Sequence, residues 1–504
     1  MLHKPLEADV VVVGLGAAGV TAAITAHDLG ARVLVLEKAP EEFSGGNSRV
    51  SGQIVFWPNN PEKGAAYLRA MAGPYTDGLT DALVRTWAIE MHENRHWLES
   101  MGLDAKFVQS VEFPDLPGAD CVEVMLHGDG PYGEARLWDG VIDPAFRARN
   151  IPTLYESPAT RLLRDGDAVT GVVARQRGAD VHVEARQAVV LCCGGFQNDQ
   201  AMIRNFLSDL PCCYPLGTPY NTGDGVRMAT AAGAALWHMN NFAGPMLAFK
   251  AAEHPVSCRL GPAKADSYIH VGGDGTRFIG EASNFKMVNG RQLSTIKHGK
   301  VLLNGRYVQY PCPLPIHMIF DESVRRAGGI CGSAAGFTFG WDVIHGDLYA
   351  WSPENSREIA KGWIRQASSI AELASCIGLS PDVLTDTVTR YNDACSRGVD
   401  DEHGRNPASL APLSRAPYYA IELTPASLNT QGGPVRNERA QVMGVDGRPI
   451  PRLYSAGELG SIYGYRYQAG GNLGECFAFG RIAGRNAARE APRVSHVDPR
   501  PAAG

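Results

Sequence analysis

Val10–Gly19 reads V-V-V-V-G-L-G-A-A-G, and this stretch decides the fold. Its four valines predict a strand buried on both faces, because no polar side chain alternates with them. The next residues, Ala17–Leu29, predict a helix that Gly30 ends. A second apolar run, Val33–Leu36, leads directly to Glu37, whose carboxylate could accept hydrogen bonds from a ribose diol. Strand, turn, helix, strand and acid in this order form the fingerprint of a dinucleotide-binding unit.

The glycines of this turn have separate functions. Gly14 permits the tight turn, Gly16 lets the backbone approach a pyrophosphate, and Gly19 lets the helix lie close to the sheet. The helix N-terminus, including Ala17 and Ala18, offers unpaired N–H groups and the positive end of a dipole to the phosphates. The alternative is a glycine-rich turn without a ligand, which the complete unit disfavours.

Composition narrows the class of protein. A chain of 504 residues with 44% hydrophobic residues is long enough for two or three domains, and a net charge of -6 argues against nucleic acid as a partner. No apolar run approaches the roughly 18 residues of a membrane span. Residues Met1–Asp9 carry charge and no signal-peptide core, so a cytoplasmic location is expected. The 11 scattered cysteines form no C-x-x-C pair, so neither a disulfide framework nor a metal site is expected.

Further segments combine glycines with small polar residues in the way that lets a backbone face a nucleotide. The candidate cofactor-binding residues outside the fingerprint are Lys38; Gly45, Gly46, Asn47, Ser48, Ser51 and Gly52; Gly194 and Gly195; Thr222 and Asp224; and Gly457, Glu458, Gly471, Asn472 and Leu473. Asp224 could accept from a cofactor hydroxyl or cap the helix that follows it, and its residue type leaves both open. The glycines before Asn472 predict a second helix N-terminus that can stabilise an anion.

The strand and helix pattern changes along the chain. We expect residues 1–240 to form the first part of a nucleotide-binding domain, residues 241–417 a separate lobe, residues 418–490 the second part of the domain, and residues 491–504 a loose tail. Residues 76–101 predict one helix with apolar positions at Leu83, Trp87, Ile89 and Trp97, and residues 103–140 predict an irregular surface excursion. A helix begins at Ser380 as N-cap.

Five motifs together resemble a known family. They are the fingerprint, G-G-N-S-R at Gly45–Arg49, C-G-G-F at Cys193–Phe196, T-G-D-G at Thr222–Gly225, and the closing A-G-E with G-G-N-L. The chain thereby resembles the flavoproteins related to fumarate reductase and succinate dehydrogenase, which include tricarballylate dehydrogenase and the 3-ketosteroid dehydrogenases. The resemblance implies an α/β fold in which a Rossmann-like FAD-binding domain is interrupted by an α+β capping domain, with the substrate between cap and flavin.

The resemblance also assigns expected roles in cofactor binding. It implies that Glu37 holds the adenosine ribose, that Ser48 lies near the flavin, and that Glu458 and Gly471–Leu473 face the ribitol and pyrimidine. Covalently flavinylated relatives carry a histidine near the G-G-N-S-R motif, where this chain has Asn47. Non-covalent FAD is therefore expected.

The expected substrate residues depart from the dicarboxylate pattern. By the resemblance, a proton-donating arginine is expected near Phe285, a histidine at Asn429 and a carboxylate-binding arginine at Gln468, which are the three candidate substrate-binding positions. None of the three carries the expected residue, which argues against fumarate reduction. The run that begins at Tyr467, Y-Q-A-G-G-N-L-G-E-C, instead looks like that of the 3-ketosteroid Δ4-dehydrogenases, in which this tyrosine is the catalytic base; their serine two positions later is Ala469 here. The R-F-x-x-E-x-x-x-F run that ends at Phe285 looks like tricarballylate dehydrogenase.

The working hypothesis is transfer of two hydrogens across a C–C bond next to a carbonyl. A hydride passes between the β-carbon and flavin N5, and a proton moves between the α-carbon and a side chain. Tyr467 is the first candidate for that side chain. In an extended loop, the side chains of Tyr463 and Tyr465 would lie on the same side as that of Tyr467. The three tyrosines could then form a hydrogen-bonded relay or an aromatic wall. Arg466 could bind a substrate carboxylate or form a salt bridge.

Other classes of function stay open. They are a dehydrogenase or reductase of a carboxylic acid, a flavin oxidase or an amine or alcohol oxidoreductase, and a non-catalytic flavin-binding protein. In the lobe formed by residues 241–417, the candidates for a catalytic role are Tyr307, Tyr310 and His317, on the basis of residue type only. The expected partners are a small-molecule substrate and an unidentified electron donor or acceptor. Because no second dinucleotide fingerprint is present, that partner is expected to be a quinone, a dye-like acceptor or another protein.

Overall fold

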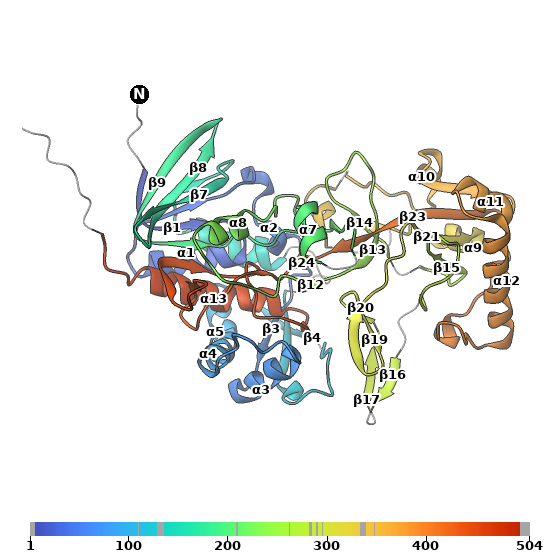
Figure 1. The fold of residues 1–504 in the computed structure, drawn as a ribbon, viewed down its shortest axis with the longest axis horizontal. Helices are drawn as coiled ribbons and strands as arrows, with labels where there is room; N and C mark the ends of the chain where they lie inside the picture. The colour runs from blue at the N-terminus through green and yellow to red at the C-terminus, as the bar shows by residue number, and fades with distance from the viewer. Residues whose placement is uncertain are drawn as a thin grey trace, which may run out of the picture.

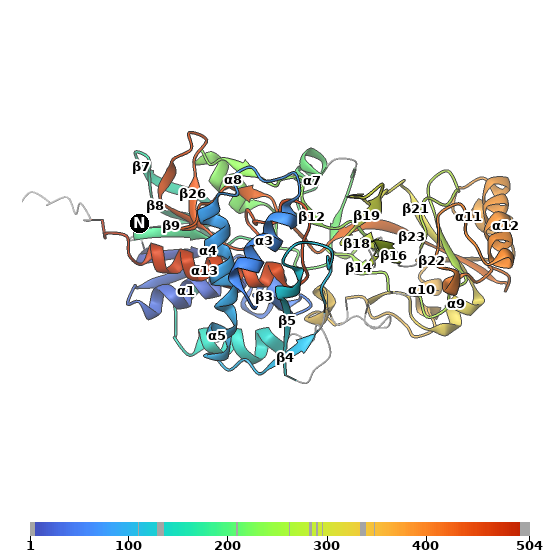
Figure 2. The same ribbon diagram turned by 90° about the horizontal axis from the view of Figure 1, so that it is seen from below.

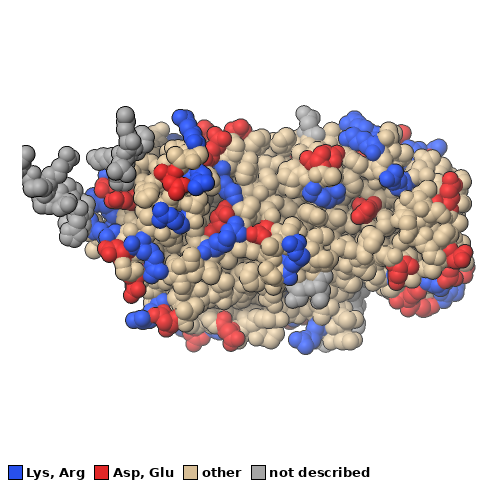
Figure 3. All heavy atoms as spheres, turned by 45° about the horizontal axis from the view of Figure 1, so that its top comes forward, with Lys and Arg blue, Asp and Glu red and all other residues tan. Residues whose placement is uncertain are grey.

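The computed structural model describes residues 6–108, 110–128, 136–207, 210–261, 263–281, 285–288, 291–294, 296–332, 339–346 and 348–493, with the backbone alone for 285–288, 291–294 and 296–297. Two large sheets lie toward opposite ends of an elongated molecule (Figure 1). Among the described residues, no helix has both the length and the apolar character that crossing a bilayer requires. Both signs of charge are interspersed over the face drawn in Figure 3.

The first sheet has eight strands and contains the fingerprint. Its strands are β1 (Leu6–Val13), β2 (Val33–Leu36), β6 (Thr153–Leu154), β7 (Ala159–Asp165), β8 (Ala168–Gln176), β9 (Ala179–Leu191), β26 (Gln441–Met443) and β27 (Pro449–Ser455). The order is β26-β27-β9-β1-β2-β6, and β27, β9, β1, β2 and β6 run parallel. The valine run is confirmed as a strand buried on both faces, since Val10 and Val12 pack into one core cluster and Val11 and Val13 into another.

Two helices cover one face of this sheet side by side. They are α1 (Ala17–Asp28) and α13 (Gly471–Ala487) (Figures 1 and 2). Helix α1 ends where predicted, with Gly30 at φ +90° just beyond it. On the other side of the sheet lie the helices α7 (Gln200–Phe206) and α8 (Asp224–Ala231). Strand β10 (Tyr214–Pro215), between them in sequence, belongs to the second large sheet.

A helical subregion packs against α13. It contains α2 (Gly46–Arg49), α3 (Pro61–Ala72), α4 (Asp81–His92), α5 (Asn94–Glu99) and α6 (Asp143–Arg147). The single helix predicted over residues 76–101 is wrong, because α4 and α5 are separate helices that meet at Glu93. Of the apolar positions of the predicted helix, Leu83 and Trp87 are buried, whereas Ile89 is 47% exposed. The two faces of a helix this polar are hard to distinguish by spacing alone.

The irregular segment predicted over residues 103–140 contains regular structure. Strands β3 (Val55–Pro58), β4 (Ala105–Val108) and β5 (Val122–His127) form an antiparallel sheet in the order β3-β5-β4. The prediction failed because β3, which lies more than forty residues away in sequence, supplies the pairing that holds β5. Strands β4 and β5 have a mixed, partly exposed burial pattern rather than a strict alternation.

The second large sheet has seven strands. They are β10, β13 (Met246–Phe249), β14 (Cys258–Arg259), β15 (Tyr268–Val271), β21 (Ile316–Asp321), β22 (Ile364–Ala367) and β23 (Tyr418–Ser427). Helices α9 (Glu322–Ala327), α10 (Ser356–Ala360), α11 (Ile370–Cys376) and α12 (Pro381–Arg397) surround it (Figure 1). Ser380 caps α12 as predicted by accepting from Val383 N. Strand β23 starts where the sequence predicts the return to the nucleotide-binding domain, yet it pairs with four strands of this second sheet.

Small sheets lie between the two large ones. They are β11 (Leu236–Trp237) with β25 (Gly433–Pro434), β12 (Phe242–Ala243) with β24 (Asn429–Thr430), β16 (Phe285–Val288) with β17 (Arg291–Ser294), and β18 (Ile296–Lys297) with β19 (Lys300–Leu303) and β20 (Arg306–Gln309). The first two pairs are crossing points, where the chain passes to the second sheet and returns from it.

Candidate active site

A cavity of about 700 Å³ lies at the carboxyl ends of the parallel strands of the first sheet. Its lining runs from Val13 to Cys476, so segments from nearly the whole chain meet there. In open α/β sheets this edge is where ligands bind, because the loops that leave the strands diverge.

The fingerprint turn forms one wall of the cavity. Gly14 has φ +100°, and a Cβ at this position would lie 2.4 Å from Cys192 O, so only glycine fits. Gly16, Ala17 and Ala18 line the cavity at the N-terminus of α1. The N-cap of α1 is Gly16, which has no side chain, and Ala17 N donates to Ser48 Oγ at 3.0 Å. The positive end of the α1 dipole thus faces the cavity.

Glu37 and Lys38 lie beside this wall. Glu37 accepts from Leu15 N and Ala39 N, each at 2.7 Å, and burial raises the pKa of its carboxyl. Lys38 Nζ donates to Asp224 at 2.7 Å and also bonds Thr222. Asp224 is therefore not the N-cap of α8, a position that Gly223 occupies, but the ion-pair partner of Lys38 in the cavity wall.

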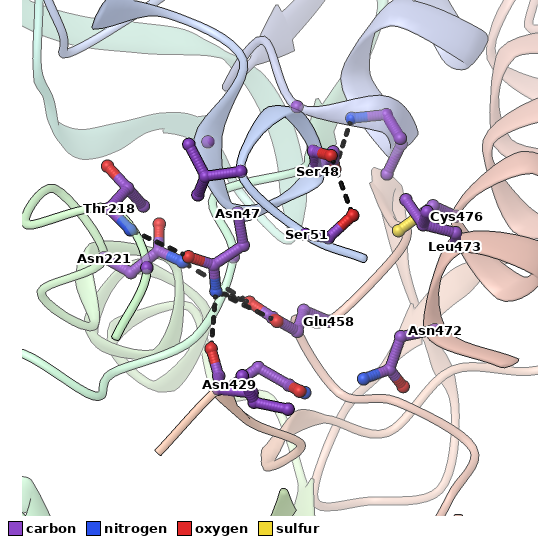
Figure 4. A pocket seen from close by; sticks show the side chains of 18 of the residues that line it. Asn47, Ser48, Ser51, Thr218, Asn221, Asn429, Glu458, Asn472, Leu473 and Cys476 are labelled. Carbon is purple, nitrogen blue, oxygen red and sulfur yellow. Dashed lines mark hydrogen bonds between the residues drawn. The ribbon is translucent and has the colours of Figure 1, made fainter. Parts of the chain in front are cut away.

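Asn47 and Glu458 meet in the middle of the cavity (Figure 4). Asn47 Nδ2 donates to Leu428 O at 3.1 Å and to Glu458 at 3.3 Å, and its Oδ1 accepts from Thr218 N at 3.0 Å. Burial raises the pKa of Glu458 to about 8, although Asn47 and the N–H of Gly195 stabilise its charged form. A neutral Glu458 is a hydrogen-bond donor as well as an acceptor, which suits a polyol.

A second helix N-terminus faces the cavity. Gly470, the N-cap of α13, has φ +83°, and a Cβ there would lie 2.6 Å from Phe56 N. No side chain caps α13, and its first turn has no acidic residue. Asn472 and Leu473 line the cavity at this end (Figure 4). The helix dipole can therefore stabilise negative charge on a bound group.

The candidate cofactor residues divide into lining and supporting positions. Those that line the cavity are Gly14, Gly16, Ala17, Ala18, Glu37, Lys38, Gly46, Asn47, Ser48, Ser51, Gly52, Gly194, Asp224, Glu458, Asn472 and Leu473. Those that lie behind this lining are Gly19, Gly45, Gly195, Thr222, Gly457 and Gly471. Gly19 shows the supporting role, because a Cβ there would lie 1.9 Å from Gly14 O.

Tyr467 and Asn429 both line the cavity. The Tyr467 ring lies 5.6 Å from that of Tyr463 and 4.9 Å from that of His298, edge to face in both cases. Arg259, stacked over Phe339 at 4.7 Å, also lines the cavity. An aromatic hydroxyl, an amide and a guanidinium thus belong to the lining beyond the glycine turns.

The other candidate catalytic residues point elsewhere. The Tyr463 hydroxyl is buried and has no hydrogen-bond partner among the described residues. The Tyr465 hydroxyl donates to Tyr307 O at 2.8 Å, and Arg466 packs over Phe113 and donates to Ala70 O at 3.2 Å. The three tyrosines therefore form no common relay, because the loop is not extended.

The candidate substrate residues are also separated. Asn429 lines the cavity, whereas Gln468 is fully buried and uses its amide to bond Tyr67, Ser110 O and Glu112 N. The side chain of Phe285 lies outside the part of the chain that the structure describes.

The lobe candidates lie apart from the cavity lining. His317 is buried in β21, and Tyr310 packs against Phe278. Tyr307 contacts Tyr465 and Phe113.

Sequence reasoning missed many residues that line the cavity, and two of them form an acid–base pair. These are Glu112 and His298, and His298 Nε2 lies 2.7 Å from Glu112 Oε2. Glu112 belongs to the segment predicted to be irregular, in which no chemistry could be placed, and His298 sits in a hairpin turn. The only available signal was the His298-Gly299 dipeptide, which is weak because turns of this kind are common on surfaces.

The cavity fits FAD. The N-termini of α1 and α13 can hold a pyrophosphate and stabilise a reduced ring, and Glu37 and Glu458 line the same cavity. Its volume is within the range of cofactor sites.

Comparisons with known proteins agree. The model of a family described as "FAD binding domain" matches residues 9–473. The chain is 27% identical to fumarate reductase (cytochrome) of Shewanella frigidimarina over 95% of this chain and 77% of that protein. It is 27% identical to vinyl phenol reductase of Lactiplantibacillus plantarum over 98% of each chain, and 26% identical to 3-oxosteroid 1-dehydrogenase of Mycobacterium tuberculosis over 96% and 99%.

Two solved structures share the fold. One is 3-ketosteroid Δ1-dehydrogenase from Sterolibacterium denitrificans, with a TM-score of 0.73, 22% identity and coverage of 96% and 99%. The other is the open conformation of a flavocytochrome c3 fumarate reductase, with a TM-score of 0.69, 24% identity and coverage of 96% and 79%. The chain therefore belongs to the FAD binding domain family, and FAD is its cofactor.

Proposed function

We propose that this protein is an FAD-dependent oxidoreductase that adds or removes two hydrogens across a C–C bond next to a carbonyl, on a neutral ketosteroid-like or cyclic enone substrate. The observation that carries the proposal is Tyr467, which presents a phenol to the cavity just before the N-terminus of α13. Relatives that act on such bonds, by their names, include 3-oxosteroid 1-dehydrogenase.

The cofactor is held by the residues that line the first part of the cavity. In the proposal, α1 and Ser48 hold the pyrophosphate side, Glu37 the adenosine ribose, and Glu458 with Asn472 and Leu473 the ribitol and ring. Bound FAD supplies a hydride acceptor or donor at N5. Because Asn47 carries an amide, which is not a nucleophile, where covalently flavinylated relatives carry a histidine, non-covalent FAD is proposed. Acid precipitation should then release all the flavin into the supernatant.

The substrate, in this proposal, lies between the FAD-binding domain and a capping domain. Residues 241–417, continued by β23, form the cap, and the FAD-binding domain occupies the rest up to residue 490. Met246, Arg259 and Phe339 reach the cavity from that side. Such an arrangement excludes water from the reacting carbon, which strengthens each polar contact there.

Tyr467 then acts on the α-carbon of the substrate. In reduction its hydroxyl gives a proton to that carbon, and in oxidation its oxygen receives it. Asn429, which also lines the cavity, can donate an amide hydrogen to the carbonyl oxygen and so stabilise the negative charge that develops there.

A carboxylic acid is the second candidate substrate. The observation in its favour is Arg259, the one arginine among the described residues that line the cavity. A guanidinium binds a carboxylate through two parallel hydrogen bonds. Arg259 would thereby replace the histidine and the arginine that are expected at positions 429 and 468, where this chain has Asn429 and Gln468.

Anaerobic flavin bleaching tests the proposal. The purified protein is mixed with ketosteroids, cyclic ketones, vinyl phenols and tricarboxylic acids, and oxidation of the reduced protein by the corresponding enones is followed in parallel. Bleaching by a ketone or steroid supports the first candidate, and bleaching by acids alone supports the second. Bound FAD that no compound reduces or oxidises overturns both and favours a flavin-binding protein without catalysis.

The electron partner is tested in the same preparation. We propose a quinone, a dye-like acceptor or another protein, because the chain has a single dinucleotide fingerprint. Peroxide formed under air at the rate of turnover would instead identify an oxidase.

A further inference from the structure

His298 reaches the cavity from a hairpin, and Glu112 reaches it from a loop far away in sequence. The Nε2 atom of His298 lies 2.7 Å from Glu112 Oε2, and the imidazole ring lies 4.9 Å from the ring of Tyr467. The His298 side chain is 17% exposed and that of Glu112 is 9% exposed. An acid–base pair therefore lies against the tyrosine that the proposed function uses.

The backbone that carries His298 is fixed in an uncommon conformation. His298 and Gly299 form the two-residue turn between β18 and β19, and both have positive φ, at +46° and +75°. Such turns require positive φ at both positions and favour asparagine and glycine. A Cβ on Gly299 would lie 1.9 Å from Gly244 C, and Gly244 N donates to His298 O at 3.0 Å. The turn is thus packed against its neighbour, and the position of the imidazole is determined by that packing.

Glu112 is fixed independently of His298. Its Oε2 accepts from Ala469 N at 2.9 Å, and its own N–H donates to Gln468 Oε1 at 3.1 Å. Both bonds tie it to the loop that carries Tyr467. Since an ionised carboxylate only accepts, His298 donates through Nε2–H, and its Nδ1 is left to exchange a second proton.

Resting on the proposed function, we propose that His298, positioned by Glu112, is the proton relay that recharges Tyr467. In reduction the Tyr467 O–H bond breaks, and its proton forms the new C–H bond with the electron pair of the former double bond. The phenolate oxygen then takes the Nδ1 proton of the His298 imidazolium, which becomes neutral imidazole. The Nε2–H group of His298 keeps its proton and its hydrogen bond to Glu112. Solvent returns a proton to Nδ1, and oxidation runs the same steps in reverse.

The titratable groups around the imidazole are few among the described residues. Glu112 faces it from the loop after β4, and Tyr467 faces it from the loop before α13. Lys300, two residues along the same hairpin, directs its Nζ to Asn241 Oδ1 and Tyr465 O instead. A histidine limb in a pH–rate profile would therefore report this pair.

Kinetics of the FAD-loaded enzyme with the best substrate of the panel test the relay. For His298→Gln we expect kcat to fall about 100-fold, KM to change by less than threefold, the FAD content to stay the same, and one limb of the pH–rate profile to disappear. His127→Gln is the matched control, because His127 lies outside the cavity lining and its Nδ1 accepts only a backbone N–H from Asp104. A His298→Gln rate within twofold of wild type, or an unchanged limb, overturns the relay. So does a parallel loss of FAD and activity, which would indicate a purely structural residue.

The tautomer of His298 tests the positioning role of Glu112 without catalytic turnover. In the ¹⁵N NMR spectrum of the substrate-free holoprotein, labelled at histidine, His298 is expected to carry its proton at Nε2, and Glu112→Gln should alter that signal. A proton at Nδ1, or a signal that Glu112→Gln leaves unchanged, overturns the positioning role. A flavin that no panel compound bleaches would overturn the proposed function and the relay with it, whereas wild-type turnover with an unaffected His298→Gln variant overturns the relay alone.

Discussion

Two tyrosines in one loop differ in what their hydroxyls can reach. Tyr463 and Tyr467 pack edge to face, but only Tyr467 lines the cavity. If the phenol oxygen moves the proton, Tyr467→Phe should lower kcat at least 100-fold, since proton transfer by a positioned group contributes about 10²–10⁴-fold. Stopped-flow flavin bleaching measures this loss directly.

Tyr463→Phe is the matched variant for that measurement. The hydroxyl it removes is buried without a described partner, so the ring contact with Tyr467 survives and the rate should stay within about threefold of wild type. Equal losses in the two variants would remove Tyr467 from the mechanism and indicate an aromatic wall.

Glu458 gives a prediction about pH at the same scale. Burial raises its pKa from 4.5 to about 8, so between these values the folded state binds more protons than the unfolded state. The free energy of unfolding then falls as pH rises through this window, by up to about 1.4 kcal/mol per pH unit. The contribution is complete below pH 4.5 and lost above pH 8.

Glu458→Gln tests this, because glutamine can still accept from Asn47 and Gly195 but does not titrate. In urea unfolding of the apoprotein, the curve of stability against pH should be flatter for the variant across pH 4.5–8. Parallel curves for the two proteins would show that the carboxyl titrates at its ordinary pKa.

The sequence predicted the residues whose chemistry is local. Glycines with a required φ or a required close approach are recognisable from the motif, as at Gly14 and Gly470. Glu112 and His298 were not recognisable, because the pair is separated by 186 residues and neither belongs to a motif. Only the folded chain brings such side chains together.

The contact between α1 and α13 carries a prediction at the scale of the element. Gly484 on α13 approaches α1 so closely that a Cβ there would lie 2.4 Å from Ala22 O and 3.0 Å from Thr25 Cβ. Alanine gains up to about 1 kcal/mol of helix propensity over glycine, but overpacking costs about 1–3 kcal/mol. We therefore expect Gly484→Ala to lower the thermal midpoint and to weaken FAD binding, since α1 carries the wall at Gly16.

Gly346→Ala is the control for this measurement. A Cβ at Gly346 meets no atom within 4 Å, and its φ is not positive, so the same substitution should change stability by less than about 0.5 kcal/mol. A Gly484→Ala protein as stable as the control would mean that the two helices can move apart at no cost.

Helices and strands were predictable where a strong local sequence pattern specified them. The valine run and the Ser380 cap are local and strong, and the structure has both. Strands β4 and β5 were missed because their pairing partner β3 is distant in sequence. Strand β23 lies within residues 418–490, which the sequence predicts to belong to the nucleotide-binding domain, and it pairs with β21 of the second sheet.

At the scale of the whole molecule, the cavity joins parts of the chain that are far apart. Its lining begins at Val13 in the first strand of the first sheet, includes Arg259 on the second sheet, and ends at Cys476 in α13. A ligand that contacts all of these parts stabilises the folded chain as a unit, because it binds only when they are assembled. At a concentration 100 times its Kd, such a ligand adds about 2.7 kcal/mol.

FAD should therefore raise the unfolding temperature of the apoprotein more than FMN does. In the proposed arrangement, Glu458 and α13 face the ring and ribitol, which FMN has, and Glu37 and α1 hold the adenosine half, which FMN lacks. FMN would then contact only part of the lining. Thermal unfolding of the apoprotein at matched concentrations of FAD, FMN and ADP measures the difference, and Glu37→Gln should reduce the effect of FAD and ADP while leaving that of FMN unchanged. Equal shifts with FAD and FMN would mean that the fingerprint end of the cavity binds nothing, and that the ring site alone holds the molecule together.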